Sequence, residues 1–151
     1  MFSNRFSLPI VVVVACTAEL LSSCEKDAPV YSDIPAISLI SVSPSSVTET
    51  QAITFSIKYT DGDGDLGENN PAIYNLFLTD TRVNVTYQYR IDQLAPDNSN
   101  IAITGTLDVM LNSTAITDGS SSQNIIYTIY VIDRAGHQSN TITCPVLNVH
   151  K

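Results

Sequence analysis

Three aspartates that alternate with glycines form the most chemically suggestive stretch of the chain. Asp61, Asp63 and Asp65 lie within the segment YTDGDGDLGENN at residues 59–70. Side chains at every second position of an extended or gently curled backbone project to one side. Carboxylates held about 5 Å apart repel one another by on the order of 3 kcal/mol per pair at an effective dielectric near 20. A hard divalent cation would reverse the sign of that interaction, because Ca²⁺ binds about 6 to 8 oxygen ligands.

The spacing of these aspartates matches positions 1, 3 and 5 of a compact calcium-binding loop. The match to an EF-hand ends there, because Leu66 stands where glycine is usual and Ala72 where a bidentate glutamate is usual. Further ligands must come from elsewhere, and the candidates are Glu68, Asn69, Asn70 and the distant Asp133. The sequence therefore predicts a structural Ca²⁺ site built from Asp61, Asp63, Asp65, Glu68, Asn69 and Asp133.

A polar turn is the simpler explanation of the same residues. Asp-Gly is common turn chemistry, and exposed carboxylates screened by salt need no metal. Three aligned aspartates exceed what a turn requires, so we favour a calcium loop over residues 61–70 and keep the turn as the alternative. In either case the expected role is structural rather than catalytic.

Strands are the elements that must position these residues. Apolar and polar residues alternate with period two from residue 36 onward, and no stretch has a helical apolar period. Seven such runs, separated by turn-rich segments, cover residues 36–43, 53–59, 73–80, 83–91, 101–111, 124–133 and 139–149. This pattern predicts an all-β domain over residues 36–151, folded as an antiparallel β-sandwich.

The segment YVIDRAGHQSNTIT, residues 130–143, resembles the last hairpin of bacterial Ig-like and fibronectin-III-like domains. In those domains a strand ends in Asp-x-x-Gly-Asn before the final strand. Asp133 and Gly136 match that pattern, and His137 stands where asparagine is usual. The resemblance implies an Ig-like sandwich of about seven strands.

The N-terminal residues have the features of a processed export signal. An apolar run at residues 8–15 is too short to span a bilayer, which needs about 20 residues, but it suits a signal peptide. The segment LSSCEKD that follows resembles the lipobox of bacterial lipoproteins, in which the cysteine becomes the first residue and carries the lipids. The resemblance implies a signal peptide over residues 1–23, lipidation (palmitate) at Cys24 and a flexible tether over residues 24–35.

Two alternatives remain for this region: a similar box that ends at Cys16, and an ordinary signal peptide with an incidental cysteine. The CEKD start also resembles the export signal of surface-displayed lipoproteins of the Bacteroidota, in whose lipoproteins DGDGDLG segments recur. We therefore expect a lipid anchor in the outer membrane, with the domain facing the periplasm or the cell surface. Cys144 is then left without a disulfide partner, and we expect it to be buried as a small apolar residue.

Charge and motif content exclude several classes of function. Residues 25–151 hold 6 basic and 14 acidic side chains, which argues against nucleic-acid binding. Neither histidine has metal-ligand spacing, and the chain lacks a nucleophile elbow or a phosphate-binding loop. We expect a non-catalytic, monomeric envelope module of the binding or adhesion type, with an unidentified protein or glycan partner. The alternative is a structural spacer or accessory subunit of a larger envelope complex; an exposed apolar patch would favour the binding module.

Overall fold

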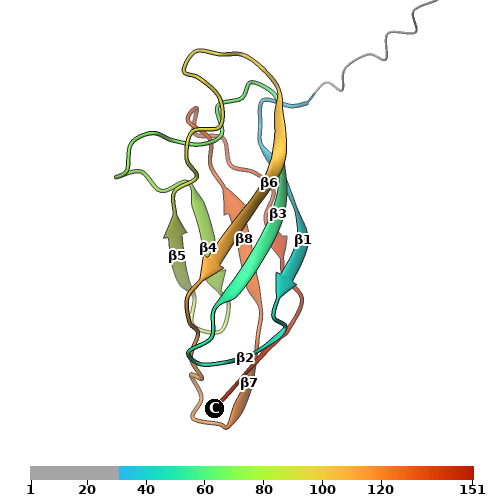
Figure 1. Ribbon diagram of the computed structural model, residues 1–151, viewed down its shortest axis with the longest axis vertical. Helices are drawn as coiled ribbons and strands as arrows, with labels where there is room; N and C mark the ends of the chain where they lie inside the picture. The colour runs from blue at the N-terminus through green and yellow to red at the C-terminus, as the bar shows by residue number, and fades with distance from the viewer. Residues whose placement is uncertain (1–30) are drawn as a thin grey trace, which may run out of the picture.

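The computed structural model describes residues 31–151, so the expected signal peptide, Cys24 and the first residues of the tether lie outside the described part. Ten strands and no helix occur within residues 31–151 (Figure 1). The strands are β1 (Ala36–Ser43), β2 (Ser46–Thr48), β3 (Ile53–Asp61), β4 (Leu76–Asp80), β5 (Val85–Tyr89), β6 (Ile103–Leu111), β7 (Ser122–Ile125), β8 (Tyr127–Val131), β9 (Ile142–Thr143) and β10 (Leu147–His150). The chain is therefore all-β over its described length.

The strands form two layers. One sheet has the order β1-β3-β6, and the other has the order β5-β4-β8-β9. A short sheet, β2-β10-β7, continues the second layer, because β7 and β10 adjoin β8 and β9 along the chain. All pairings are antiparallel except the parallel pair of β2 with β10.

The β-sandwich prediction is confirmed, but the strand count is ten rather than seven. The expected strand 124–133 divides at Ile126 into β7 and β8, and the expected strand 139–149 divides into β9 and β10. Pro145 lies in the second gap and has no N–H to donate to a ladder, which accounts for that interruption. The third additional strand, β2, lies in a segment that the sequence pattern assigned to a turn.

Alternating side chains from the two sheets fill the core. Ile53, Phe55 and Ile57 of β3 are fully buried, and burial of each such side chain is worth about 1.5–3 kcal/mol. Phe55 meets Tyr127 of the opposite sheet edge to face, with ring centroids 5.3 Å apart. Cys144 is buried as expected, and this burial raises the pKa of its thiol to about 11. The thiol is therefore protonated and unreactive at neutral pH.

Two groups of buried aspartates lie at opposite ends of the sandwich. Asp80 is the last residue of β4, and Asp133 follows β8, which runs antiparallel to β4 with Leu76 opposite Val131. Asp61 ends β3 and lies beside Asp133 rather than beside Asp80. We call Asp61, Asp63, Asp65 and Asp133 the acidic cluster, and the surroundings of Asp80 and Arg82 the arginine cluster.

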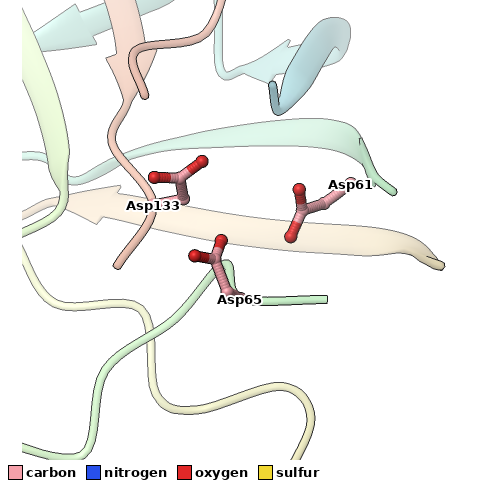
Figure 2. A group of neighbouring side chains, drawn as sticks. All are labelled: Asp61, Asp65 and Asp133. Atoms are coloured by element: carbon pink, nitrogen blue, oxygen red, sulfur yellow. The ribbon is translucent and has the colours of Figure 1, made fainter. Parts of the chain in front are cut away.

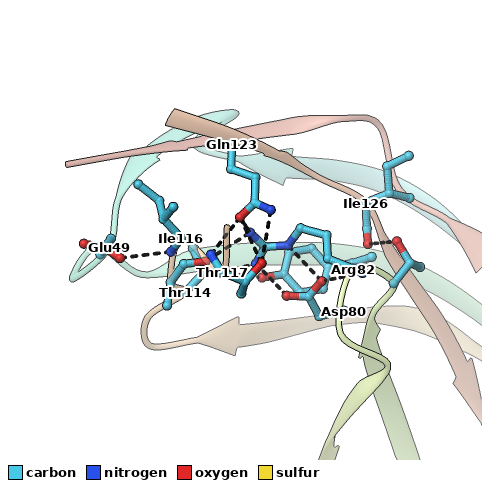
Figure 3. Close-up of polar contacts among 11 residues, drawn as sticks. Glu49, Asp80, Arg82, Thr114, Ile116, Thr117, Gln123 and Ile126 are labelled. Atoms are coloured by element: carbon cyan, nitrogen blue, oxygen red, sulfur yellow. Dashed lines mark hydrogen bonds and ion pairs between the residues drawn. The ribbon is translucent and has the colours of Figure 1, made fainter. Parts of the chain in front are cut away.

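The arginine cluster neutralises its own buried carboxylate (Figure 3). Arg82 Nε and Nη2 donate to the two oxygens of Asp80 at 3.0 and 2.6 Å. Arg82 Nη1 also donates to the Ala115 carbonyl at 3.0 Å and to Gln123 Oε1 at 2.6 Å. Burial would lower the pKa of Arg82, but the hydrogen bonds and charge of Asp80 raise it above its ordinary value. Arg82, which Asp80 holds in place, thus ties the loop between β6 and β7 to the sandwich through its bond to Ala115.

Candidate metal centre

Asp61 is the most deeply buried member of the acidic cluster. It pairs with Ile103 in the β3–β6 ladder, and its exposed fraction is 0%. The chain curls back at once, so that the backbone N–H of Leu66 donates to Asp61 Oδ2 at 2.8 Å. Leu66 is itself fully buried and ties the curl to the core. The other oxygen, Asp61 Oδ1, is buried and has no hydrogen-bond partner among the described residues.

The curl after Asp61 depends on glycine. Gly64 has a φ of 76°, in the left-handed region that side chains rarely adopt. A Cβ at Gly64 would also lie 2.3 Å from the carbonyl oxygen of Ile101, closer than any real contact. Gly62 donates its backbone N–H to Ser32 at 2.8 Å, which fixes the start of the loop. The alternating Asp-Gly pattern therefore permits a tight wrap that brings successive carboxylates inward.

The loop between β8 and β9 closes the cluster from the other sheet. The backbone N–H of Ala135 donates to Asp65 Oδ2 at 2.9 Å, and that of Arg134 donates to the Asp65 carbonyl at 3.3 Å. Asp133 is 6% exposed and accepts the His137 N–H through Oδ1 at 2.7 Å. Its Oδ2 contacts His137 Nδ1 at 3.0 Å. The two bonds to Asp65 dock the predicted final hairpin onto residues 61–70, which we call the aspartate loop, while the two contacts of Asp133 with His137 lie within the hairpin.

The result is a convergence of carboxylates from three segments. Asp61, Asp65 and Asp133 each offer one oxygen, and these three oxygens lie within 4.8 Å of one another. Figure 2 shows the three side chains pointing toward a common space between β3, the aspartate loop and the segment after β8. Three oxygens of the loop, Asp61 Oδ1, Asp63 Oδ1 and Asp65 Oδ1, are buried without a partner in the described structure.

The described chain places little positive charge against these carboxylates. Arg134 lowers the pKa of Asp65 through its charge, but its Nη1 donates to the Gly67 carbonyl at 3.0 Å and forms no ion pair with the cluster. Burial, followed by the charges of Asp63, Asp65 and Asp133, raises the pKa of Asp61 from 3.8 to about 6. Burial and the charge of Asp133 likewise raise the pKa of Asp65. The cluster therefore carries an uncompensated electrostatic cost.

The remaining ligands expected from the sequence occupy the outer part of the loop. Glu68 Oε1 accepts the N–H of Asn70 at 2.8 Å, and Asn70 Oδ1 accepts the N–H of Ala72 at 3.0 Å. The exposed Asn69 side chain donates to Gln93 Oε1. Glu68 is not part of the group formed by Asp61, Asp65 and Asp133. In this arrangement Glu68, Asn69 and Asn70 shape the loop, while Asp133 reaches the cluster as the sequence led us to expect.

Several contacts at the site have no counterpart in the sequence prediction. The amides of Leu66 and Ala135 hold one oxygen of Asp61 and one of Asp65, which leaves the second oxygen of each free to face the shared space. The side chain of His137 orients Asp133. Backbone donors leave no trace in residue types, so only the fold could identify them. The departure from asparagine at residue 137 was the one available signal.

The donor set fits a hard divalent cation. All the free atoms are carboxylate oxygens, the ligands that Ca²⁺ and Mg²⁺ prefer, and no sulfur or free imidazole nitrogen joins the group. Ca²⁺ suits a site formed by a flexible loop, because it tolerates irregular geometry, whereas Mg²⁺ demands near-octahedral coordination. Asp61, Asp65 and Asp133 are the residues that would hold the ion, whereas Asp63, also expected as a ligand, lies outside this group and adds its charge nearby.

Two further findings concern membrane spans and similarity to known proteins. Within residues 31–151 we find no helix with the length and apolar character needed to cross a bilayer. The chain has no significant match to a protein-family model, to a curated protein or to a solved structure. The functional argument therefore rests on the geometry and chemistry of the acidic cluster and of the surface around it.

Proposed function

We propose that this chain is a non-catalytic, lipid-anchored binding module of the bacterial cell envelope whose loop at residues 61–70 holds a structural Ca²⁺ ion. The observation that supports the ion is the set of three buried carboxylate oxygens without partners. A buried acceptor left unsatisfied costs about 1–3 kcal/mol, and more when it is charged. A divalent cation held by Asp61, Asp65 and Asp133 would neutralise these converging carboxylates and offset the repulsion from the nearby charge of Asp63.

The ion would join the two sheets at one end of the sandwich. Asp61 belongs to β3 of the three-stranded sheet, whereas Asp133 follows β8 of the four-stranded sheet. One cation bound to both would hold the sheets and the aspartate loop together. Sites of extracellular modules have dissociation constants of about 10⁻⁴ to 10⁻³ M. Stabilisation would reach about 2.7 kcal/mol at a free Ca²⁺ concentration of 100 times that constant.

The envelope location rests on the N-terminal sequence, and the binding role rests on the surface. The LSSC box at residues 21–24 supports an anchor at Cys24, and acyl chains contribute about 0.8 kcal/mol per buried methylene. An apolar groove of about 410 Å³ opens between the two sheets, with Leu76, Ile91 and Val109 among its lining residues. An exposed apolar groove favours a binding module over a structural spacer.

Metal binding is tested on the chain from residue 25, which retains all ten strands. Metal analysis after dialysis against Ca²⁺ should find one ion per chain, and the melting temperature should be higher in millimolar Ca²⁺ than in EDTA. Asp61→Asn should abolish this difference. Asp118→Asn, at an exposed aspartate of the loop between β6 and β7, should preserve it. Equal melting temperatures in Ca²⁺ and EDTA would reject the calcium loop.

The anchor is tested separately by metabolic labelling of the full chain with a palmitate analogue in a Gram-negative host. Labelling should be lost in Cys24→Ser and retained in Cys16→Ser. The opposite result would move the anchor to Cys16, and the absence of label from the unaltered chain would leave an ordinary signal peptide as the better explanation.

A further inference from the structure

The two sheets leave the same side of the sandwich open. β5 is the edge strand of the four-stranded sheet and pairs only with β4, while β6 is the edge strand of the other sheet and pairs only with β3. The groove of about 410 Å³ lies between these two edges, lined by residues 89–92 at the end of β5 and 107–110 of β6. It gives solvent access to the interior of the sandwich.

The groove has an apolar floor and a charged rim that includes Arg90, Asp92 and Asp108. Leu76, Ile91 and Val109 of the core line it, together with the half-buried Leu94 and Leu107. Its rim carries charged and exposed side chains. Part of the apolar surface of the core stays exposed to water at this opening. A ligand that covers it gains about 25 cal/mol for each Å² of apolar surface that it buries.

The backbone of β6 is available beside this floor. Its nine residues pair with β3 on one side, and none of the other backbone hydrogen bonds of the described chain involves residues 103–111. At about 3.3 Å per residue, the edge extends over roughly 30 Å. Unpaired N–H and C=O groups along an edge form a template for another extended strand.

The opposite edge of the same sheet is capped at one residue near the start of β1. Asn140 reaches β1 from the segment before β9, where its Oδ1 accepts the N–H of Ile37 at 2.9 Å and its Nδ2 donates to the Ile37 carbonyl at 2.9 Å. This side chain occupies the place that a neighbouring strand would take. The β1 edge is therefore capped at Ile37, whereas no backbone group of β6 has a partner on its outer side among the described residues.

The charges around the groove indicate which class of ligand it suits. Asp108 is exposed on β6, and the side chain of Asp92 on the facing rim is 79% exposed. Arg90 pairs with Asp92 at 2.6 Å and donates to the Glu68 carbonyl at 3.0 Å, so Asp108 is the rim charge that has no ion-pair partner among the described residues. The chain as a whole has a net charge of −8, so a second copy would bring like charge to the unpaired Asp108. A basic partner is electrostatically complementary.

We propose that the groove binds an extended, basic peptide segment of a partner protein, which adds a strand to the β6 edge and places alternate apolar side chains between the sheets. This inference rests on the binding role proposed above and identifies the class of partner, but it does not depend on the metal. Main-chain hydrogen bonds to an edge strand supply affinity in this mode of recognition, and pockets for alternate side chains supply specificity. Asp108 would select lysine or arginine at an outward position of the bound segment.

The test selects a phage-displayed library of random nine-residue peptides on the mature chain carrying Cys24→Ser, in saturating Ca²⁺. Enriched peptides should alternate apolar residues with lysine or arginine, and a synthetic copy should slow amide hydrogen exchange in residues 103–111. Leu107→Trp, which fills the groove, should weaken that peptide at least tenfold. Ile40→Trp, at an exposed residue of β1, is the matched control and should leave the affinity unchanged.

Asp108→Lys should shift the selected peptides from basic to acidic composition. Enrichment of no peptide, or binding that Leu107→Trp does not affect, would overturn the proposal. So would a concentration-dependent dimer in sedimentation that Leu107→Trp abolishes, because the occupant would then be a second copy. A failure of the calcium loop appears in the melting experiment instead, so the two proposals fail independently.

Discussion

The two ends of the sandwich bury carboxylates in opposite ways. Asp80 and Asp61 each end a strand, and they are 2% and 0% exposed. Two residues after Asp80 the chain has Arg82, which forms a two-point contact with it. Two residues after Asp61 the chain has Asp63, and then Asp65. The comparison teaches that one end carries its own counter-charge, whereas the other leaves its carboxylates without one, which is why we propose a cation from solution there.

The largest expected effect comes from removing the internal cation. Arg82→Met leaves Asp80 buried without its partner and should lower the free energy of unfolding by about 3–5 kcal/mol. Urea denaturation monitored by circular dichroism measures this change. The double variant Asp80→Asn with Arg82→Met should recover most of the loss, because the uncompensated charge is then absent. A double variant no more stable than Arg82→Met would show that the arginine acts through packing alone.

A second prediction compares one glycine at each end. Gly64 and Gly119 have the same φ of 76°, but a Cβ at Gly119 would meet nothing within 4 Å. Gly119→Ala should therefore cost only the backbone strain, about 1–2 kcal/mol. Gly64→Ala also pushes the loop away from Ile101 and should cost about 2–4 kcal/mol, with a weaker response to Ca²⁺. Equal costs in thermal melts would mean that the wrap against Ile101 is unimportant.

The third prediction concerns pH in the absence of metal. Because the folded pKa of Asp61 is raised to about 6 from 3.8, the folded state binds this proton more tightly than the unfolded chain does. The contribution of Asp61 to stability in EDTA should be fully present below about pH 4 and should be lost as the pH rises through 6, by on the order of 2–3 kcal/mol. Stabilisation by Ca²⁺ should grow over the same interval, because the ion requires ionised carboxylates.

Urea denaturation at a series of pH values, in EDTA and in Ca²⁺, measures both trends. Asp61→Asn removes the titrating group and should flatten the EDTA profile between pH 4 and pH 7. A metal-free protein that gains stability over this range, and does so equally in Asp61→Asn, would contradict the assignment to Asp61.

The smallest expected change in stability comes from neutralising one buried aspartate at each end of the sandwich, and it compares the two ends most directly. In EDTA at pH 7, Asp61→Asn should stabilise the protein by about 1–2 kcal/mol, because it removes a buried like charge. Asp80→Asn should destabilise it, because Arg82 then lacks its ion pair. In Ca²⁺ both substitutions should destabilise. The melting temperature of each variant in each buffer measures these effects. If both substitutions changed the melting temperature in EDTA in the same direction, the proposed difference between the two ends would be wrong.

The sandwich and the aspartate loop could be predicted from the sequence, because both depend on local sequence patterns. Ile53, Phe55 and Ile57 alternate with polar residues, and they face the core as the period of two requires. The division of the expected strand 124–133 could not be predicted, because Ile126 lies in a continuous apolar run with no turn residue, whereas Pro145 was an available signal for the division of the last strand. The arginine cluster was missed altogether, since nothing in Asp80 and Arg82 distinguishes a buried pair from two exposed turn residues.

Residue types and spacing determined that three carboxylates would lie close together on a loop that contains glycines, because Asp-Gly alternation is a property of the sequence itself. Asp133 was a distant candidate in the sequence, but only the tertiary structure decided that it lies beside Asp61 and Asp65 and that the amide of Ala135 orients Asp65. The same holds for the groove, which exists because β5 and β6 end their sheets on one side. Sheet order arises from long-range pairing, and no local pattern encodes which edge is left without a partner.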